Sequence, residues 1–135
     1  MHDLHGLRLN QVTLGAIDFA ASVSFYKRLG LKLIVDSAPR YVRFEFPQLE
    51  NGSDPATLSL HIVEKGWKAP SEVPLIYFEV DDVAAFLRDT KTDPIDPPEM
   101  KTYLWEEADI IDPSGNRIRV FKAGSARRFP PWRIE

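Results

Sequence analysis

Short stretches in which apolar and polar residues alternate recur along the chain, and this pattern predicts β-strands with one buried face. In the clearest stretch, Leu58, Leu60 and Ile62 alternate with Ser59 and His61. The strands predicted in this way cover residues 7–14, 31–35, 41–46, 57–63, 75–80, 103–111 and 117–121.

Two stretches with helical spacing of apolar residues each follow an aspartate. Asp18 precedes the first stripe, and Gly30 follows it at a position that favours the left-handed backbone conformation. Asp81 or Asp82 precedes a shorter stripe within residues 83–87. Aspartate accepts hydrogen bonds from the first free N–H groups of a helix, so both stretches are predicted to be capped helices.

The order of these elements repeats. Each half reads strand, helix and then mostly strands, with an aspartate opening the helix. We therefore predict an α+β fold of two paired βαβββ modules, at about residues 7–64 and 75–123, that form a curved mixed sheet around a concave ligand cavity. Residues 1–123 would form a single domain, followed by a C-terminal tail at 124–135. The alternative is two unrelated β-α-β stretches within an ordinary α+β domain.

Composition narrows the classes of partner. The chain has 135 residues, 44% of them hydrophobic, which suits one compact domain with a core. Its net charge of −3 does not favour nucleic acid as a partner, because phosphate binding needs a basic face. No apolar run is long enough to span a bilayer, the first residues do not resemble a signal peptide, and there is no cysteine. We expect a cytoplasmic protein without membrane or nucleic-acid partners.

Several motifs resemble those of a known superfamily. Residues 9–14, Asp18 and residues 24–33 resemble the first module of the vicinal oxygen chelate superfamily, which includes glyoxalase I, bleomycin-resistance proteins and extradiol dioxygenases. Residues 77–83 resemble the start of its second module, and the turn at residues 112–116 resembles its last turn. The resemblance implies a glyoxalase-like fold, but it does not specify a reaction because this fold carries several activities.

The metal site of that superfamily can be compared position by position. Its ligands are His or Gln in the first strand, Glu in the fourth, His at the start of the fifth and Glu in the last. Gln11 matches, whereas Ser59, Leu75 and Arg119 occupy the other three positions. Leucine cannot coordinate a metal, and a guanidinium is a permanently charged donor. The standard metal site is therefore predicted to be absent.

Strand alternation within this resemblance places a set of polar and aromatic residues on the concave face. The ligand-binding candidates are Gln11, Arg43, Ser59, His61, Tyr77, Glu79, Trp105, Glu107, Arg117 and Arg119. Gln11, His61, Glu79 and Glu107 would be adequate ligands for a displaced divalent metal, the one cofactor considered. The alternative is that His61 and the carboxylates bind each other and the arginines.

These candidates suggest recognition of a small polar or anionic organic molecule. Arg117 and Arg119 could hold a carboxylate or a phosphate, and the carboxylate of Glu107 or Glu79 could act as a catalytic base with His61 as its partner. The first hypothesis is a metal-free binding protein of the glyoxalase and bleomycin-resistance type. The alternative is a metal-dependent lyase or dioxygenase, and the third is a structural or interaction domain.

The tail differs in composition from the two modules. Residues 127–134 combine arginines, prolines and two aromatic residues, Phe129 and Trp132. Proline at two consecutive positions excludes a regular helix there. We expect Phe129 and Trp132 to pack either on the domain or across a dimer interface. Relatives of this superfamily commonly dimerise, so the resemblance implies a homodimer, with Trp132 as a candidate anchor.

Overall fold

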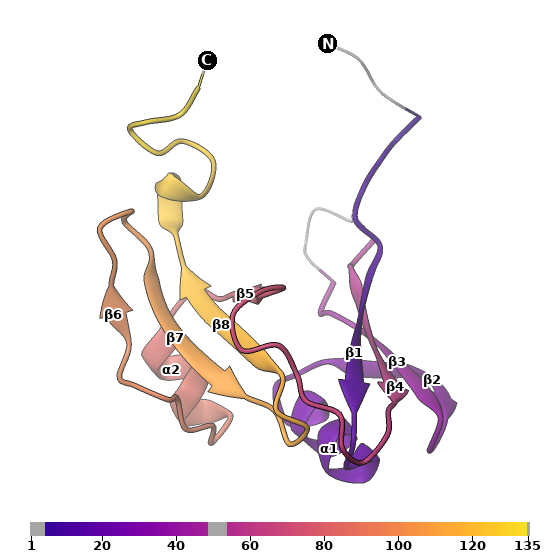
Figure 1. The fold of residues 1–135 in the computed structure, drawn as a ribbon. Helices are drawn as coiled ribbons and strands as arrows, with labels where there is room; N and C mark the ends of the chain where they lie inside the picture. Colours follow the sequence, from indigo (N-terminus) through magenta and orange to yellow (C-terminus); the bar gives the residue numbers. More distant parts are fainter. Residues whose placement is uncertain (1–4, 49–53, 135) are drawn as a thin grey trace. The chain divides into compact units, whose positions relative to one another are not determined.

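The protein is described here by a computed structural model, in which residues 5–48 and 54–134 can be placed (Figure 1). The chain divides into two compact units, Met1–Trp67 and Lys68–Glu135. Each unit contains one helix and a four-stranded mixed sheet, in the orders β1-β4-β3-β2 and β5-β8-β7-β6. The elements are β1 (Gln11–Ala16), α1 (Phe19–Arg28), β2 (Lys32–Ser37), β3 (Tyr41–Glu45), β4 (Thr57–Ile62), β5 (Ile76–Glu79), α2 (Val83–Asp89), β6 (Glu99–Met100), β7 (Glu106–Ile111), β8 (Arg117–Lys122) and a 3-10 turn, η1 (Gly124–Arg127).

Both units have the predicted βαβββ order. The first strand of each unit pairs in parallel with the last one, β1 with β4 and β5 with β8, and the remaining pairs are antiparallel. The two predicted βαβββ modules of an α+β fold are confirmed.

The two helices begin where the sequence predicts. The Asp18 carboxylate accepts a hydrogen bond from the Ala21 amide at 3.1 Å, and Asp82, rather than Asp81, accepts one from the Ala85 amide at 2.9 Å. Gly30 has a φ of 109°, in the left-handed region that glycine adopts without strain. Local sequence chemistry thus sets the helix boundaries.

Two strand predictions need correction, and one short strand was missed. The first strand begins at Gln11 and not at Leu7, because pairing with β4 begins at Gln11, and Leu7 is 86% exposed. The strand predicted from Tyr103 begins at Glu106, since a turn occupies residues 101–105 and the Leu104 amide bonds to the Lys101 carbonyl at 3.0 Å. The two-residue strand β6 was not predicted at all.

The core of the second unit lies between its sheet and α2, which contacts β7 and β8. Phe78, Ile118 and Val120 alternate with the polar residues of their strands and are at most 6% exposed. Strand alternation predicts the same burial for Val80, and for Val12 and Leu14 in the first unit, but these three residues are only partly covered. The central strands of the first unit are buried to the same degree, since Phe44, Leu58 and Leu60 have no exposed surface.

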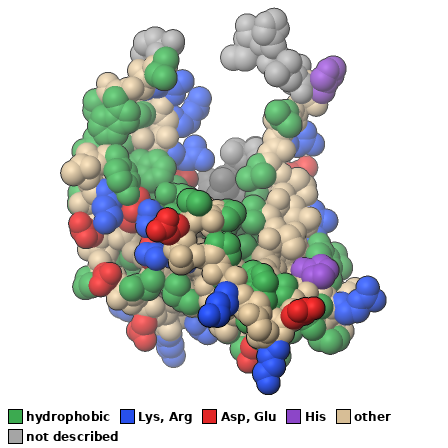
Figure 2. Space-filling model, viewed as in Figure 1, with side chains coloured by type: hydrophobic (Ala, Val, Ile, Leu, Met, Phe, Trp, Pro, Cys, Tyr) green, Lys and Arg blue, Asp and Glu red, His purple; other side chains and the backbone are tan. Residues whose placement is uncertain are grey.

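The face of the molecule shown in Figure 2 has no dominant sign of charge. On the face shown in Figure 2, basic and acidic side chains are scattered among hydrophobic and neutral ones. The described helices include none that is long and apolar enough to cross a bilayer.

Gly15 is a tightly packed position of the first unit, and it supplies a stability test. A Cβ atom at this residue would lie 2.7 Å from the ring of Trp67, whereas one at Gly66 would meet nothing within 4 Å. We expect Gly15→Ala to displace the indole and to lower the free energy of unfolding by about 1–3 kcal/mol, as overpacking does. Denaturant melts would measure this, with Gly66→Ala as the control. Equal stability of the two variants would show that Trp67 moves freely.

Candidate functional site

The polar face of the second sheet is built by strand register. Tyr77 lies opposite Arg119, which in turn lies opposite Asp109 on the next strand. One step along, Glu79 and Glu107 both lie opposite Phe121. Because directly opposed residues share a face, these side chains all lie on the side of the sheet away from the buried layer of Ile118 and Val120.

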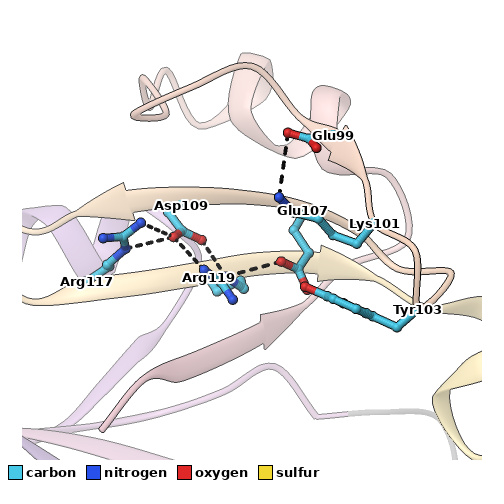
Figure 3. Close-up of polar contacts among 7 residues, drawn as sticks. All are labelled: Glu99, Lys101, Tyr103, Glu107, Asp109, Arg117 and Arg119. Atoms are coloured by element: carbon cyan, nitrogen blue, oxygen red, sulfur yellow. Dashed lines mark hydrogen bonds and ion pairs between the residues drawn. The ribbon is translucent and has the colours of Figure 1, made fainter. Parts of the chain in front are cut away.

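Asp109 joins the two arginines on this face (Figure 3). Arg119 donates from Nε to Asp109 Oδ1 at 2.7 Å and from Nη2 to Oδ2 at 2.9 Å. Arg117 approaches Oδ2 with Nε at 2.7 Å and Nη2 at 2.6 Å. One carboxylate therefore serves as the counter-ion for two guanidinium groups.

The electrostatics of Asp109 and Arg119 follow from this arrangement. Burial by itself would raise the pKa of Asp109, but hydrogen bonds from Arg119 and Arg117 outweigh burial and lower the pKa below its usual value. The hydrogen bonds to Asp109 raise the pKa of Arg119 above its usual value. Both groups are charged in the neutral pH range.

Glu107 extends the arrangement toward the β6–β7 turn. Its side chain is only 2% exposed, and Oε2 accepts a hydrogen bond of 2.6 Å from the Tyr103 hydroxyl. Oε1 lies 3.3 Å from Arg119 Nε but receives no hydrogen bond. The single hydrogen on that nitrogen is directed to Asp109 instead. The buried carboxylate is thus compensated in charge, while one of its oxygens lacks a donor.

Tyr103 lies at the outer end of the series of contacts from Asp109 through Arg119 and Glu107, and its titration can be predicted. Burial raises its pKa to about 12, and the hydrogen bond and negative charge of Glu107 add to the effect. We expect Glu107→Gln to lower the pKa of Tyr103 only part of the way to its usual value of about 10, because the burial remains. The measurement is tyrosinate absorbance, taken as the difference between each protein and its Tyr103→Phe counterpart.

The raised pKa of Tyr103 also makes the free energy of unfolding depend on pH. Because folding raises this pKa, Tyr103 contributes stability below about pH 10 that is lost as the pH rises toward 12. The fall in unfolding free energy over this window should be steeper in the unsubstituted protein than in the Tyr103→Phe variant. A Tyr103 titration centred near 10 in the unsubstituted protein would contradict both the burial of this hydroxyl and its hydrogen bond to Glu107.

Aromatic rings flank the charged residues on the same face. Trp105 stacks on Phe121 with ring centroids 4.4 Å apart, and Tyr77 meets the edge of both rings. Tyr103 approaches Trp105 at 6.2 Å, and Trp105 Nε1 donates to the Ala126 carbonyl at 3.3 Å. Tyr77 and Tyr103 are 45% and 39% exposed, so the edge of this aromatic group is open to solvent.

A small pocket lies beside the charged residues, where residues 95–101 run along β7. Its volume is about 120 Å³. It is lined by Ile95, Asp96, Pro97, Glu99, Lys101, Glu107, Ala108, Asp109, Arg117 and Arg119. Lys101 Nζ lies 3.6 Å from Glu99 Oε2, so most of the charges lining the pocket are paired (Figure 3).

The candidates in the first unit are engaged with neighbours in that unit. Gln11 Oε1 accepts from the Tyr41 hydroxyl at 3.2 Å, and Arg43 donates to Thr57 and Asn10. The hydroxyls of Ser59 and Thr13 bond at 2.7 Å, with Ser59 fully buried. His61 is exposed, and its Nδ1 lies 2.7 Å from the Ile62 carbonyl. These residues form a polar, internally bonded face.

The displaced metal site gains no support. Within the described ranges, 5–48 and 54–134, no three His, Cys, Asp or Glu side chains are grouped to hold a metal ion. Glu79, one of the four candidate ligands, binds Arg127 at 2.6 Å, and Glu107 binds Tyr103. Gln11 lies in the first strand, β1, as the superfamily position requires, and its side chain accepts a hydrogen bond from Tyr41.

The expected partners of Arg119 are partly corrected. From the sequence, the partner expected for the inward-facing arginines was an external anion, Glu79 or Glu107. Glu107 is close, Glu79 pairs with Arg127, and the principal partner, Asp109, was missed. The turn at residues 112–116 could have revealed it, because counting back from this turn places Asp109 opposite Arg119.

Comparison with known proteins gives the following matches. The family profile described as Glyoxalase/Bleomycin resistance protein/Dioxygenase superfamily matches residues 8–120. No curated protein sequence matches the chain significantly.

Solved structures with the same fold are numerous. A lactoylglutathione lyase from Agrobacterium tumefaciens is 19% identical with a TM-score of 0.66, over 90% of this chain and 97% of that one. A glyoxalase/bleomycin resistance protein/dioxygenase from Nocardioides is 20% identical with a TM-score of 0.68, over 96% and 90%. A bleomycin-binding protein in complex with bleomycin is 21% identical with a TM-score of 0.63, over 85% and 97%. At such identities the likeness establishes the fold.

Proposed function

Because the chain belongs to the glyoxalase/bleomycin resistance protein/dioxygenase superfamily, we propose that it is a small-molecule-binding protein that acts without the superfamily's standard metal site. The binding surface is the polar face of the second sheet, and its ligand is a small polar organic molecule. The observation that carries the proposal is the mostly buried chain of Asp109, Arg119 and Glu107 beside half-exposed aromatic rings.

The physical argument concerns the free-energy cost of burying charged side chains. Removing charged groups from water costs several kcal/mol per ion unless they are paired, and apolar residues of similar volume are often at least as stable. Such networks are therefore common where a site must present polar groups in fixed positions. Tyr77, Tyr103 and Trp105 supply amphipathic surface at the edge of this network, which suits an organic ligand.

The charge state of the arginines limits the kind of ligand. Asp109 occupies both guanidinium groups, and Glu107 adds a second negative charge beside Arg119. The four groups sum to zero formal charge. A polar organic molecule therefore fits this face, and an anion is not required to balance it.

Support by analogy comes from a neighbour of similar fold. The bleomycin-binding protein was solved with bleomycin bound, so a chain of this architecture can hold an organic ligand. For the present chain, this supports binding of a small molecule but does not identify it.

The test is a nuclear magnetic resonance screen with small polar aromatic compounds. The chain has three tryptophans, and the indole N–H of Trp105 reports directly on the proposed face. We expect binders to shift the Trp105 indole signal and the amides of β7 and β8, while Trp67 in the other unit serves as an internal control. Binders that shift only signals outside this face, or no binders at all, would refute the proposed site.

Metal analysis distinguishes the alternative, a metal-dependent lyase or dioxygenase with a displaced site. Protein purified without an affinity tag or added metal should contain less than stoichiometric divalent metal. Stoichiometric metal that is lost in Gln11→Ala or His61→Ala would favour the enzyme over the binding protein.

We also propose that the tail mediates homodimer formation. Phe129, Trp132 and Ile134 are 63%, 57% and 92% exposed, so this short segment presents unusual apolar area. Sedimentation of the full chain and of a chain ending at Arg128 tests this. A dimer that is unchanged by the truncation would exclude the role, and so would a monomeric full-length protein.

A further inference from the structure

Tyr103 is the solvent-facing end of the chain of contacts that runs from Asp109 through Arg119 and Glu107. A tyrosine hydroxyl has one hydrogen to donate and lone pairs to accept with. The hydrogen of Tyr103 is donated to Glu107 Oε2 at 2.6 Å. On its outer side, the Tyr103 oxygen is therefore available only as a hydrogen-bond acceptor.

The direction of this hydrogen bond is fixed by the groups behind it. Glu107 is held next to Arg119, and Arg119 is held by two hydrogen bonds to Asp109. Glu107 presents an acceptor to Tyr103, so the hydroxyl cannot turn its hydrogen outward without giving up this bond. Such a reversal would leave the Glu107 carboxylate, only 2% exposed, with neither oxygen hydrogen-bonded.

The chain of contacts also has room for one more donor. Hydrogen bonds in series polarise one another, so a donor placed on the Tyr103 oxygen strengthens the bond from Tyr103 to Glu107. A stronger hydrogen bond at Oε2 stabilises the Glu107 carboxylate, whose other oxygen, Oε1, receives no hydrogen bond. The adjacent ring of Trp105, 6.2 Å from that of Tyr103, offers apolar surface for the rest of a ligand.

Building on the proposed function, we propose that the Tyr103 oxygen accepts a hydrogen bond from the bound molecule, which therefore carries an N–H or O–H donor, as in an amine, next to an apolar group. A carboxylate fits poorly at the same position, because both partners would present lone pairs. Arg119, for which the sequence suggested anion binding, thus helps to hold a hydrogen-bond acceptor, the Tyr103 oxygen, in place.

The experiment compares two probes of similar size, 2-phenylethylamine and 3-phenylpropanoate, on the full-length protein. In water at neutral pH the first has only donors in its polar group, and the second has only acceptors. Titrations would follow the Trp105 indole signal at low and high ionic strength, which separates a local contact from the general attraction of a protein with net charge −3. We expect the amine to bind about tenfold tighter or more, also at high salt.

Tyr103→Phe tests the contact itself, since it removes the oxygen and keeps the ring. We expect the variant to weaken amine binding by about tenfold or more, the range for a hydrogen bond with a charged group. Tyr41→Phe is the matched control, because Tyr41 donates to Gln11 in the other unit, and this variant should bind as the unsubstituted protein does.

The outcomes separate this inference from the proposed function. Equal or tighter binding of 3-phenylpropanoate overturns the inference, and so does amine binding that Tyr103→Phe leaves unchanged. In either case a ligand still binds at this face, and the proposed function stands. If neither probe shifts the Trp105 signal while the broader screen finds binders there, binders without an N–H or O–H group overturn the inference, and binders that all carry one support it. If that screen also finds none, the proposed site itself is lost.

Discussion

Replacing Asp109 with alanine should lower the free energy of unfolding by about 3 kcal/mol or more, the cost of breaking a mostly buried ion pair. The change leaves Arg119 without its two hydrogen bonds to Asp109 and removes the partner of Arg117. Arg119 is the costlier loss, because its side chain is 22% exposed and gains little from water. Equilibrium denaturation in urea would measure the loss.

An exposed pair provides the matched control. Arg88 and Asp89 form a contact of 3.3 Å with both side chains more than 70% exposed. Asp89→Ala removes the same chemical group from this pair and should change stability by less than about 1 kcal/mol. If the two variants melt alike, the charged residues on the face of the second sheet are solvated, and the cost argument for a binding site fails.

The lowered pKa of Asp109 adds a pH dependence of defined sign. A carboxyl group whose pKa is lowered by folding contributes stability above its usual pKa of about 3.9, and this contribution is lost as the pH falls further. The difference in stability between the unsubstituted protein and Asp109→Ala should therefore be full at neutral pH and shrink in acid. A difference that grows in acid would contradict the assignment.

The second large effect concerns the core. Phe78 is 6% exposed and lies on the face of β5 that continues the buried layer of Val120. Phe78→Ala should lower the unfolding free energy by about 3–5 kcal/mol, because it removes a large apolar side chain and leaves a cavity. Thermal and denaturant melts provide the measurement.

Val73→Ala is the control for this change. It shortens an apolar side chain that is 77% exposed and lies outside the tail, and we expect a loss below about 1 kcal/mol. A loss below about 1 kcal/mol at Phe78 as well would mean that β5 is in a different register, with Tyr77 and Glu79 on the wrong face.

The fold was largely predictable because its determinants are local. Helix capping by Asp18, the left-handed residue Gly30 and the alternation in β4 are each decided within a few residues. The errors arose where a strand boundary depends on the neighbouring strand with which it pairs. The start of β1 depends on where β4 begins, and β6 exists because a turn brings Glu99 opposite Glu107.

The side of the sheet that carries the candidate residues was predictable from the sequence, but the ion pairs and hydrogen bonds among them were not. Alternation placed Tyr77, Arg119 and Glu107 on one side of the sheet, as the register confirms. Asp109 was missed because it lies in an otherwise apolar stretch and was treated only as part of a hairpin strand. The Tyr103 contact could not be predicted, since it depends on the path of a turn that the alternation pattern had assigned to a strand.

The turn that closes the β7–β8 hairpin explains why register matters here. The Asp112 carboxylate accepts from the Ser114 and Asn116 amides at 2.9 and 2.8 Å and from the Asn116 side chain at 2.8 Å. These contacts fix the number of residues in the loop. A shift by one residue would turn Arg119 toward the core and expose Val120.

Asp109 can also be regarded as a tethered anion that the chain supplies to its own receptor. It binds two guanidinium groups as a free carboxylate would, with the advantage of a high effective concentration. Once the tethered group is deleted, as in Asp109→Ala, a free carboxylate such as formate or acetate has a vacant place with two donors in the proper orientation. Chemical rescue of that variant by formate would show that the two guanidinium groups can bind an anion and that the Asp109 side chain normally occupies this site.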